Sequence, residues 1–323
     1  CLEKEVVVLE KKQLLLSSLL SCFFSWGFPD NSCAFGNYAT GKVLSENLCD
    51  WGETYCAACP NPTTVITAGS SGVVCVWDVA VSKDKLTRMK LRQPLYGHTD
   101  AVTCLAASEV HSLIVSGSRD LTCILWDMEE LSYITQLAGH PTSISALAIN
   151  EKTGEIASCA GPSLYLWTMK GQLLTRADTS CGPQADILCV GLTQRHEWDA
   201  RNVIVTGCAD GVVRVSFLCA GALQMDKGWR RRLMLCEELS SGQTQRRSKN
   251  NPAITSLAMS RCSEQLKPTF LVLAVTKFEY FSLKTTTFHT ILTIFSFSGA
   301  GVMLLFWSEM PGEEFSPGLV SER

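Results

Sequence analysis

The sequence lacks a strong excess of charge of either sign. Its 323 residues carry 28 Lys and Arg against 31 Asp and Glu, a net charge of −3, and the charged share of 18% lies below the usual quarter. Nucleic-acid-binding surfaces are normally strongly basic, so nucleic acid is not expected as the main partner. With 46% hydrophobic residues, the chain can still bury a sizeable core in one large domain or two ordinary ones.

Motifs for small-molecule chemistry are also absent. There is no P-loop, no G-x-G-x-x-G after a strand and no H-E-x-x-H. The 16 cysteines are scattered through apolar runs, as is typical of buried free thiols in a reduced, cytosolic protein. Cys56 and Cys59 form a lone C-x-x-C without a second ligand pair, and His196, Glu197 and Asp199 lie in an expected solvated loop. No cofactor, metal or small-molecule substrate is therefore expected.

An N-terminal Met is missing, so we expect the chain to be a fragment of a longer protein. Leu14–Phe24 is apolar enough to suggest a signal peptide. However, several charged residues precede this segment and no small-residue cleavage site follows it, so a signal peptide is not predicted.

What the sequence does contain is an internal repeat. Strand-like segments end in Trp77, Trp126 and Trp167, and Phe217 stands where a fourth Trp is expected, at spacings of 49, 41 and 50 residues. One Gly-His pair has its His 28 residues before Trp126, and another has its His 27 residues before Trp167. An alternating, β-rich segment and a small-residue turn follow each pair. The repeat predicts all-β units of about 40–45 residues.

These features resemble the WD-repeat β-propeller family, whose four-stranded blades stack around a central channel. The resemblance implies a buried hydrogen-bond chain in which Asp120 fixes the tautomer of His98. The other ring nitrogen would meet Ser116, and Ser116 would accept from the Trp126 indole. Ser, His and Asp thus fall at structural positions of the family, and no G-x-S-x-G elbow accompanies them, so an enzyme is not expected.

The other repeat units keep only part of this set. The unit with the second Gly-His pair has His140, Ser158 and Trp167, but its turn contains no Asp. The flanking units keep fewer members: Thr67 and Trp77 in one, and Thr206, Asp210 and Phe217 in the other. We expect these units to depend on apolar packing.

Five longer stretches extend the likeness: FFSWGFPDNSC, LRQPLYGHTDAVTCLAAS, IVSGSRDLTCILWD, EWDARNVIVTGCADGVVRV and NPAITSLAMSR. They resemble the C-terminal propeller of BEACH-domain proteins, in particular the large proteins with WD repeats and a FYVE domain. The resemblance implies a non-enzymatic scaffold that binds other proteins through blade-rim loops. It implies roles in vesicle trafficking, endosome or lysosome biology, autophagy or antigen handling. It also implies a cytoplasmic location peripheral to endosomal or autophagic membranes, and a PH-like and BEACH module before Cys1.

Residues 218–250 show few strand signals and carry a net charge of about +4. We interpret this stretch as a solvated insert between blades. The alternative is a contact with an acidic partner or an anionic membrane. The candidate contact residues are Arg230, Arg231, Arg232, Arg246 and Arg247.

The tail has three open interpretations. In the first, strands at Leu271–Val275, Phe278–Leu283 and Thr287–Phe297 fill the last blade. In the second, the uncharged run Thr285–Ser308 spans a membrane and anchors the scaffold. In the third, the tail derives from an alternative exon or an incorrect gene prediction and does not pack.

The sequence therefore predicts a WD-repeat β-propeller of about five or six blades, possibly incomplete, with an atypical hydrophobic tail. The expected organisation is a segment at 1–22, propeller blades at 23–217, the basic insert at 218–250, last-blade strands at 251–283 and a divergent tail at 284–323.

Overall fold

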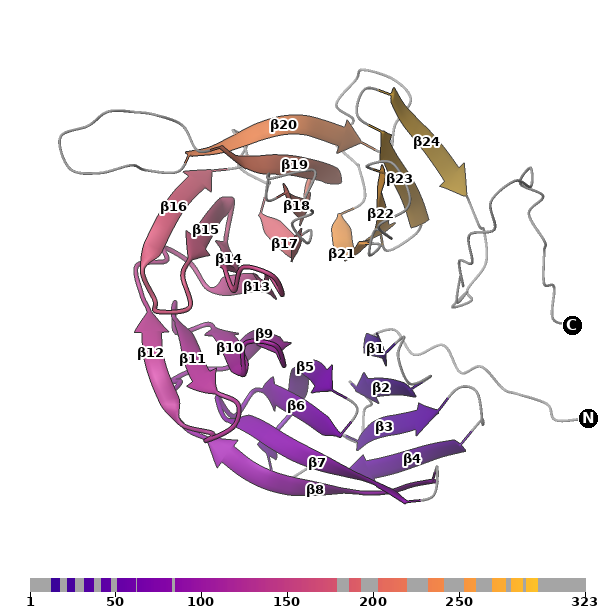
Figure 1. The fold of residues 1–323 in the computed structure, drawn as a ribbon, viewed down its shortest axis with the longest axis vertical. Coiled ribbons are helices and arrows are strands. Elements are labelled where there is room, and N and C mark those ends of the chain that lie inside the picture. The colour runs from indigo at the N-terminus through magenta and orange to yellow at the C-terminus, as the bar shows by residue number, and fades with distance from the viewer. Residues whose placement is uncertain are drawn as a thin grey trace, which may run out of the picture.

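The computed structural model of the chain describes residues 13–17, 22–26, 32–37, 42–47, 51–61, 63–82, 85–178, 186–192, 203–219, 232–240, 253–259, 269–276, 280–286 and 289–295. The 24 β-strands in this part form six four-stranded antiparallel sheets, which we call the first to sixth blades. The blades lie around a common centre, and the described strands leave the ring open between the sixth blade and the first (Figure 1). The predicted all-β propeller is confirmed.

Each blade is an up-and-down sheet in which strands that are consecutive in the chain pair with one another. The first blade consists of β1 (Gln13–Ser17), β2 (Cys22–Trp26), β3 (Ser32–Asn37) and β4 (Lys42–Asn47). The second consists of β5 (Thr54–Asn61), β6 (Thr64–Gly69), β7 (Val74–Ser82) and β8 (Lys85–Leu95).

The third and fourth blades carry the two Gly-His pairs in the connections that lead into them. The third blade consists of β9 (Val102–Ser108), β10 (Leu113–Ser118), β11 (Cys123–Asp127) and β12 (Tyr133–Leu137). The fourth consists of β13 (Ile144–Ile149), β14 (Ile156–Ala160), β15 (Ser163–Trp167) and β16 (Leu173–Asp178).

The last two blades use the C-terminal part of the described chain. The fifth blade consists of β17 (Ile187–Leu192), β18 (Val203–Cys208), β19 (Val212–Cys219) and β20 (Arg232–Ser240). The sixth consists of β21 (Ile254–Met259), β22 (Thr269–Thr276), β23 (Tyr280–Thr286) and β24 (His289–Phe295).

Neighbouring blades share their hydrophobic cores. On one face of the third blade, Ile114 and Trp126 pack with Ile66 of the second blade. On the opposite face, Val115 packs with Ile156 of the fourth blade. Because successive side chains of a strand point to opposite faces of the sheet, both faces are covered. This arrangement explains why the middle strands read as continuous apolar runs and not as alternating ones.

The innermost strands of five blades carry the same irregularity. The pairing of β5, β9, β13, β17 and β21 with their neighbours skips one residue near the strand start: Tyr55, Thr103, Ser145, Leu188 and Thr255, respectively. Such a bulge bends the strand locally. These innermost strands also contact one another in chain order around the centre of the ring. The shared bulge marks the sixth blade as the same kind of unit as the others.

Two parts of the predicted domain organisation are wrong. The first blade begins with β1 inside the predicted segment 1–22. The predicted insert 218–250 contains β20, which pairs with β19 from Val212–Ser240 to Cys219–Arg232. An outermost strand pairs on one side only, so it needs no regular apolar pattern. Its sequence, RLMLCEELS, therefore lacks the regular alternation that would predict a half-buried strand.

The described part of the tail is also β-structure. β24 pairs with the outer side of β23, and its Thr- and Ile-rich sequence suits a strand. Of the run Thr285–Ser308, the residues described lie in β23 and β24, so the membrane-anchored alternative is not supported. Within the ranges given above, no helix is long and apolar enough to cross a membrane. Residues 296–323 lie outside the described part.

Candidate functional site

The complete set of motif residues lies in the third blade. Ser116 is on β10, Trp126 on β11, Asp120 in the turn between them, and His98 in the connection that precedes β9. His98 Nδ1 lies 2.8 Å from Asp120 Oδ2, and His98 Nε2 lies 2.8 Å from Ser116 Oγ. The Trp126 indole donates to Ser116 Oγ at 2.9 Å. The structure thus brings the four side chains into one chain of hydrogen bonds.

The donors and acceptors determine the direction of these hydrogen bonds. An indole N–H can only donate and an ionised carboxylate can only accept. Ser116 Oγ therefore accepts from the Trp126 indole, and Asp120 Oδ2 accepts from the His98 Nδ1–H. Burial raises the pKa of Asp120, but hydrogen bonds from Thr122, His98 and the Thr99 backbone outweigh it and leave the pKa below its ordinary value of 3.8.

The two glycines of the Gly-His pairs have different physical roles. A Cβ on Gly97 would lie 2.9 Å from Trp126 Cη2 and 3.0 Å from Ile124 Cδ1, so a larger residue would displace the connection that carries His98. Gly139 meets no atom within 4 Å of such a Cβ, but its φ is +101°, which L-residues other than glycine rarely adopt.

This geometry argues against a Ser-His-Asp catalytic triad in the third blade. Ser116 is 0% exposed and the His98 side chain is fully buried. Ser116 Oγ also accepts from Trp126, so its lone pairs point into the sheet. A nucleophile must reach its substrate, and this hydroxyl cannot.

The fourth blade has the same arrangement without the carboxylate. His140 Nε2 lies 2.9 Å from Ser158 Oγ, which also accepts from the Trp167 indole at 2.9 Å. Among the described atoms, His140 Nδ1 has no hydrogen-bond partner, although the residue is only 5% exposed. The ring packs instead against Tyr165, with centroids 4.6 Å apart, and against Trp167 at 5.5 Å.

The surroundings of His140 favour its neutral form. Burial lowers the pKa of His140 below its ordinary value of 6.5, and the nearby Arg176 guanidinium lowers it further. The Leu121 backbone lies close enough to raise the pKa, although it does not reach the geometry of an ordinary hydrogen bond, and it does not offset burial. His140 is therefore held in its neutral form.

The second and fifth blades keep only fragments of the set. In the second, the Trp77 indole donates to Thr67 Oγ1 at 2.8 Å. In the fifth, Asp210 does not serve a histidine among the described residues but pairs with Arg214, at 2.6 Å between Oδ2 and Nη2 and 3.2 Å between Oδ1 and Nη1. Sequence reasoning missed Arg214, and the only available signal was a charged residue inside an otherwise apolar strand.

The expected equivalence of Phe217 with the tryptophans is wrong by one residue. Trp126 pairs with Ile114, two residues before Ser116, and Trp77 and Trp167 are placed likewise relative to Thr67 and Ser158. In the fifth blade, the residue two before Thr206 is Ile204, and Ile204 pairs with Ser216, while Phe217 pairs with Val203. Ser216 therefore occupies the tryptophan position.

Several other predicted residues lie outside the described part. They are Arg230, Arg231, Arg246, Arg247, His196, Glu197 and Asp199. Arg232 begins β20 and pairs in register with Cys219. The structure therefore does not test the proposed contact of the basic insert.

The described cysteines in the strands are not arranged for chemistry. Burial raises the pKa of Cys75, Cys104 and Cys189 to about 12, which keeps the thiols protonated. The Cys56 thiol donates to the carbonyls of Ala68 and Val102, at 3.6 Å and 3.9 Å. Within the described ranges, no group of His, Cys, Asp and Glu is arranged to hold a metal ion.

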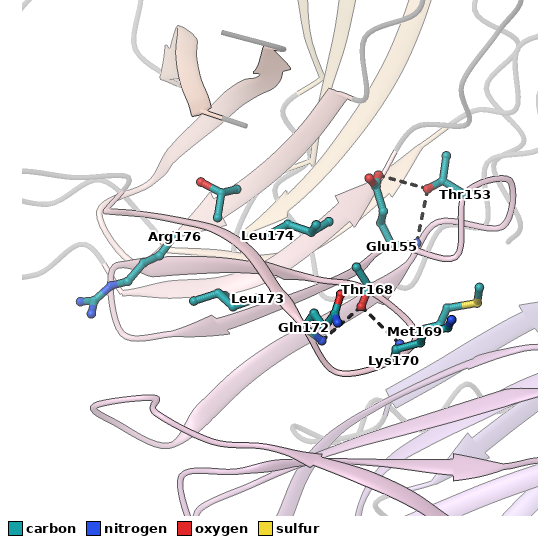
Figure 2. Close-up of a pocket in the computed structure, with 10 residues that line it drawn as sticks. Thr153, Glu155, Thr168, Met169, Lys170, Gln172, Leu173, Leu174 and Arg176 are labelled. Atoms are coloured by element: carbon teal, nitrogen blue, oxygen red, sulfur yellow. Dashed lines mark hydrogen bonds between the residues drawn. The ribbon is translucent and has the colours of Figure 1, made fainter. Parts of the chain in front are cut away.

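One surface feature gave no sequence signal. A hollow of about 820 Å³ runs along β16. In Figure 2, Arg176 lies at one end of it, Met169 and Lys170 lie at the other, and Leu173 and Leu174 lie between them. Thr153, Glu155, Thr168, Gln172 and Thr175 complete the lining. Met169 and Leu173 are 40% and 50% exposed, which leaves apolar surface in contact with water.

Comparison with known proteins agrees with the fold and its internal hydrogen bonds. Residues 89–127, which run from β8 to the end of β11, match the family described as WD domain, G-beta repeat. That range contains the complete His98, Ser116, Asp120 and Trp126 set. The blades and this match define the class of the chain as a WD-repeat β-propeller.

Within this class, the chain is similar to propeller-containing proteins of the BEACH type, as the sequence predicted. It is 44% identical over 280 residues to human WD repeat- and FYVE domain-containing protein 4, which covers 80% of this chain and 9% of that protein. It is 34% identical over 199 residues to BEACH domain-containing protein A2 of Arabidopsis thaliana, covering 60% of this chain and 6% of the relative. It is 30% identical over 205 residues to human Lysosomal-trafficking regulator, covering 60% of this chain and 5% of the relative.

Proposed function

We propose that the chain is the propeller part of a large non-enzymatic scaffold that binds other proteins. One observation carries this proposal: the polar motif residues are used for internal hydrogen bonds, whereas large apolar side chains are exposed in the connecting loops. Tyr96, between β8 and β9, is 67% exposed, and Val110, in the β9–β10 turn, is 73% exposed. Aromatic and aliphatic anchors of this kind commonly carry the binding energy of protein interfaces.

The cellular role we propose is in vesicle trafficking, endosome or lysosome biology or autophagy, with antigen handling in immune cells as one form. Support comes from the similarity to proteins of the BEACH type, one of which is named a lysosomal-trafficking regulator. The chain spans 9% of the length of its human WD repeat- and FYVE domain-containing relative, so this role concerns the whole protein. We place it in the cytoplasm, peripheral to endosomal or autophagic membranes.

The basic stretch 218–250 supports a second, weaker contact with an anionic membrane. Basic residues near such a surface contribute about 1 kcal/mol each. Vesicles with and without phosphatidylserine test this contact, and we expect binding to fall when salt is raised to about 0.15 M. Binding to uncharged vesicles, or binding that ignores salt, would exclude it.

Proximity labelling of the full-length protein in cells tests the scaffold function. A variant with Tyr96→Glu and Val110→Glu is compared with Lys152→Glu, which changes an exposed polar residue on another turn. We expect the double variant to lose a defined subset of labelled endosomal or lysosomal proteins, and the control to keep them. An unchanged set of neighbours for both variants would contradict docking through the loops.

A further inference from the structure

Tyr133 is an exposed tyrosine on the outer wall of the propeller. It begins β12, the outermost strand of the third blade, which lies on the outside of the ring (Figure 1). Its ring meets the buried Trp126 indole edge-on, with centroids 6.1 Å apart, and Trp126 is also its partner in the pairing of β11 with β12. The residue is nevertheless 56% exposed, so a modifying enzyme can reach it.

The turn before Tyr133 presents acidic side chains. Glu129 and Glu130 are exposed and lie four and three residues before the tyrosine. The backbone N–H groups of both donate to Asp127 Oδ1 at 2.8 Å, which fixes the turn. The Glu129 carboxylate also accepts from Ser112 Oγ at 2.8 Å. Two ordered carboxylates therefore precede an exposed phenol at short spacing.

The other tyrosines whose side chains the structure describes lack one of these two features. Tyr165 is buried. Tyr55 is half-buried, and the Arg119 guanidinium lies over its ring, 5.8 Å from the centroid. Tyr96 is more exposed than Tyr133, but the five residues before it, LRQPL, contain one positive charge and no carboxylate. Exposure and a preceding acidic turn therefore coincide at Tyr133.

We infer that Tyr133 is a phosphorylation site for a tyrosine kinase that selects acidic residues before its target. Basic groups of such a kinase complement Glu129 and Glu130. In the reaction, the phenolic oxygen of Tyr133 attacks the γ-phosphorus of magnesium-bound ATP, and the bond to the β-phosphate oxygen breaks. ADP leaves, and the phenol proton passes to the catalytic aspartate of the kinase. The kinase and ATP thus supply everything that the step requires beyond this hydroxyl.

Phosphorylation changes the charge of the outer wall of the third blade. A phosphate adds a charge of about −1.5 to −2 at pH 7 and three acceptor oxygens. Glu129 and Glu130 disfavour contact of this group with the turn itself, which leaves its oxygens open to a partner. Pockets that contain arginine bind such phosphates through charge-assisted hydrogen bonds. The modified tyrosine is therefore a reversible docking group, separate from the Tyr96 and Val110 loops.

Phosphorylation of the full-length protein in vitro tests the site. The protein is incubated with magnesium ATP and a purified tyrosine kinase domain that prefers acidic residues, and is then digested and analysed by mass spectrometry. We expect phosphate on Tyr133 and about tenfold less on Tyr96. Glu130→Lys should slow modification of Tyr133 about fivefold, because it reverses a charge that the kinase recognises. The matched control, Glu53→Lys, makes the same charge change at an exposed position before β5 and should leave the rate unchanged.

A synthetic peptide of residues 127–137 separates modification of the folded blade from modification of an unfolded chain. We expect the folded protein to react within about tenfold of the peptide rate, because the site is exposed without unfolding. Glu130→Lys in the peptide should slow its modification to the same degree, which excludes an effect through folding. Absence of phosphate from Tyr133, a rate about a hundredfold below that of the peptide, or equal rates for Glu130→Lys and Glu53→Lys would each overturn the inference.

Discussion

The third and fourth blades solve the same packing problem in different ways. In both, a histidine from the preceding connection reaches a buried serine, which also accepts from a tryptophan indole at 2.9 Å. Only the third blade adds a carboxylate to the outer ring nitrogen. In the fourth, Tyr165 occupies the place of Ile124 and packs against the histidine ring. Aromatic packing thus replaces the carboxylate as the support for the ring.

The replacement has a cost. His140 Nδ1 and the Tyr165 hydroxyl are buried without hydrogen-bond partners among the described residues. A buried polar group without a partner typically costs about 1–3 kcal/mol. The fourth blade is therefore expected to be less stable than the third, and more sensitive to acid.

The largest predicted effect concerns the part that both blades share. Trp126→Ala and Trp167→Ala should each lower the free energy of unfolding by about 3–5 kcal/mol, because each removes a buried indole and leaves a cavity. Denaturant unfolding followed by circular dichroism measures both variants. Equal losses support the common role of the indole. A loss below about 1 kcal/mol for either variant would contradict the claim that the indole stabilises both blades in the same way.

A smaller effect should separate the two histidines. His98→Ala is expected to cost about 1–3 kcal/mol, because it removes one buried hydrogen bond from Ser116 and one from Asp120. His140→Ala should cost about 1 kcal/mol less, since it removes one hydrogen bond, that with Ser158, and also removes a poorly satisfied ring nitrogen. The same unfolding measurement compares them. A larger loss of unfolding free energy for His140→Ala than for His98→Ala would contradict the claim that the third blade is stabilised more by its histidine than the fourth.

The smallest predicted effect concerns the pH dependence of the stability of the fold. Because the pKa of His140 is lowered in the folded state, its contribution to stability is complete above 6.5 and is lost as pH falls from 6.5 through the folded value. The Asp120 carboxylate has a pKa below 3.8, so it contributes no change in this range. Thermal unfolding between about pH 7.5 and 5.5 should therefore show a smaller fall in midpoint for His140→Leu than for the unmodified chain. Identical slopes would show that His140 does not carry this dependence.

Much of the third blade could be predicted from sequence because its constraints are local and specific. The Gly-His pair, the turn Asp and the strand Trp recur at fixed spacing, and each has a defined hydrogen-bonding capacity. The sequence pattern puts Phe217 at the tryptophan position, which Ser216 occupies in the structure. An aromatic side chain near a strand end does not by itself fix the strand pairing. Strand pairing in the fifth blade follows Thr206 and Arg214, whose spacing has no distinctive motif.

Outer strands were the least predictable elements. β20, with the sequence RLMLCEELS, lacks a regular alternation of apolar and polar residues. The hollow beside β16 depends on which side chains the strand leaves exposed, and two consecutive leucines do not indicate that Leu173 is exposed while Leu174 is partly buried. Tertiary packing determined these features, and local sequence carried no signal for them.

A double-mutant cycle between His98→Ala and Asp120→Ala tests most directly whether these residues stabilise the blade. If the two side chains act in one buried hydrogen-bond chain, their combined loss in unfolding free energy should be smaller than the sum of the single losses by about 1–2 kcal/mol. Single losses that add without coupling would contradict this account of the third blade.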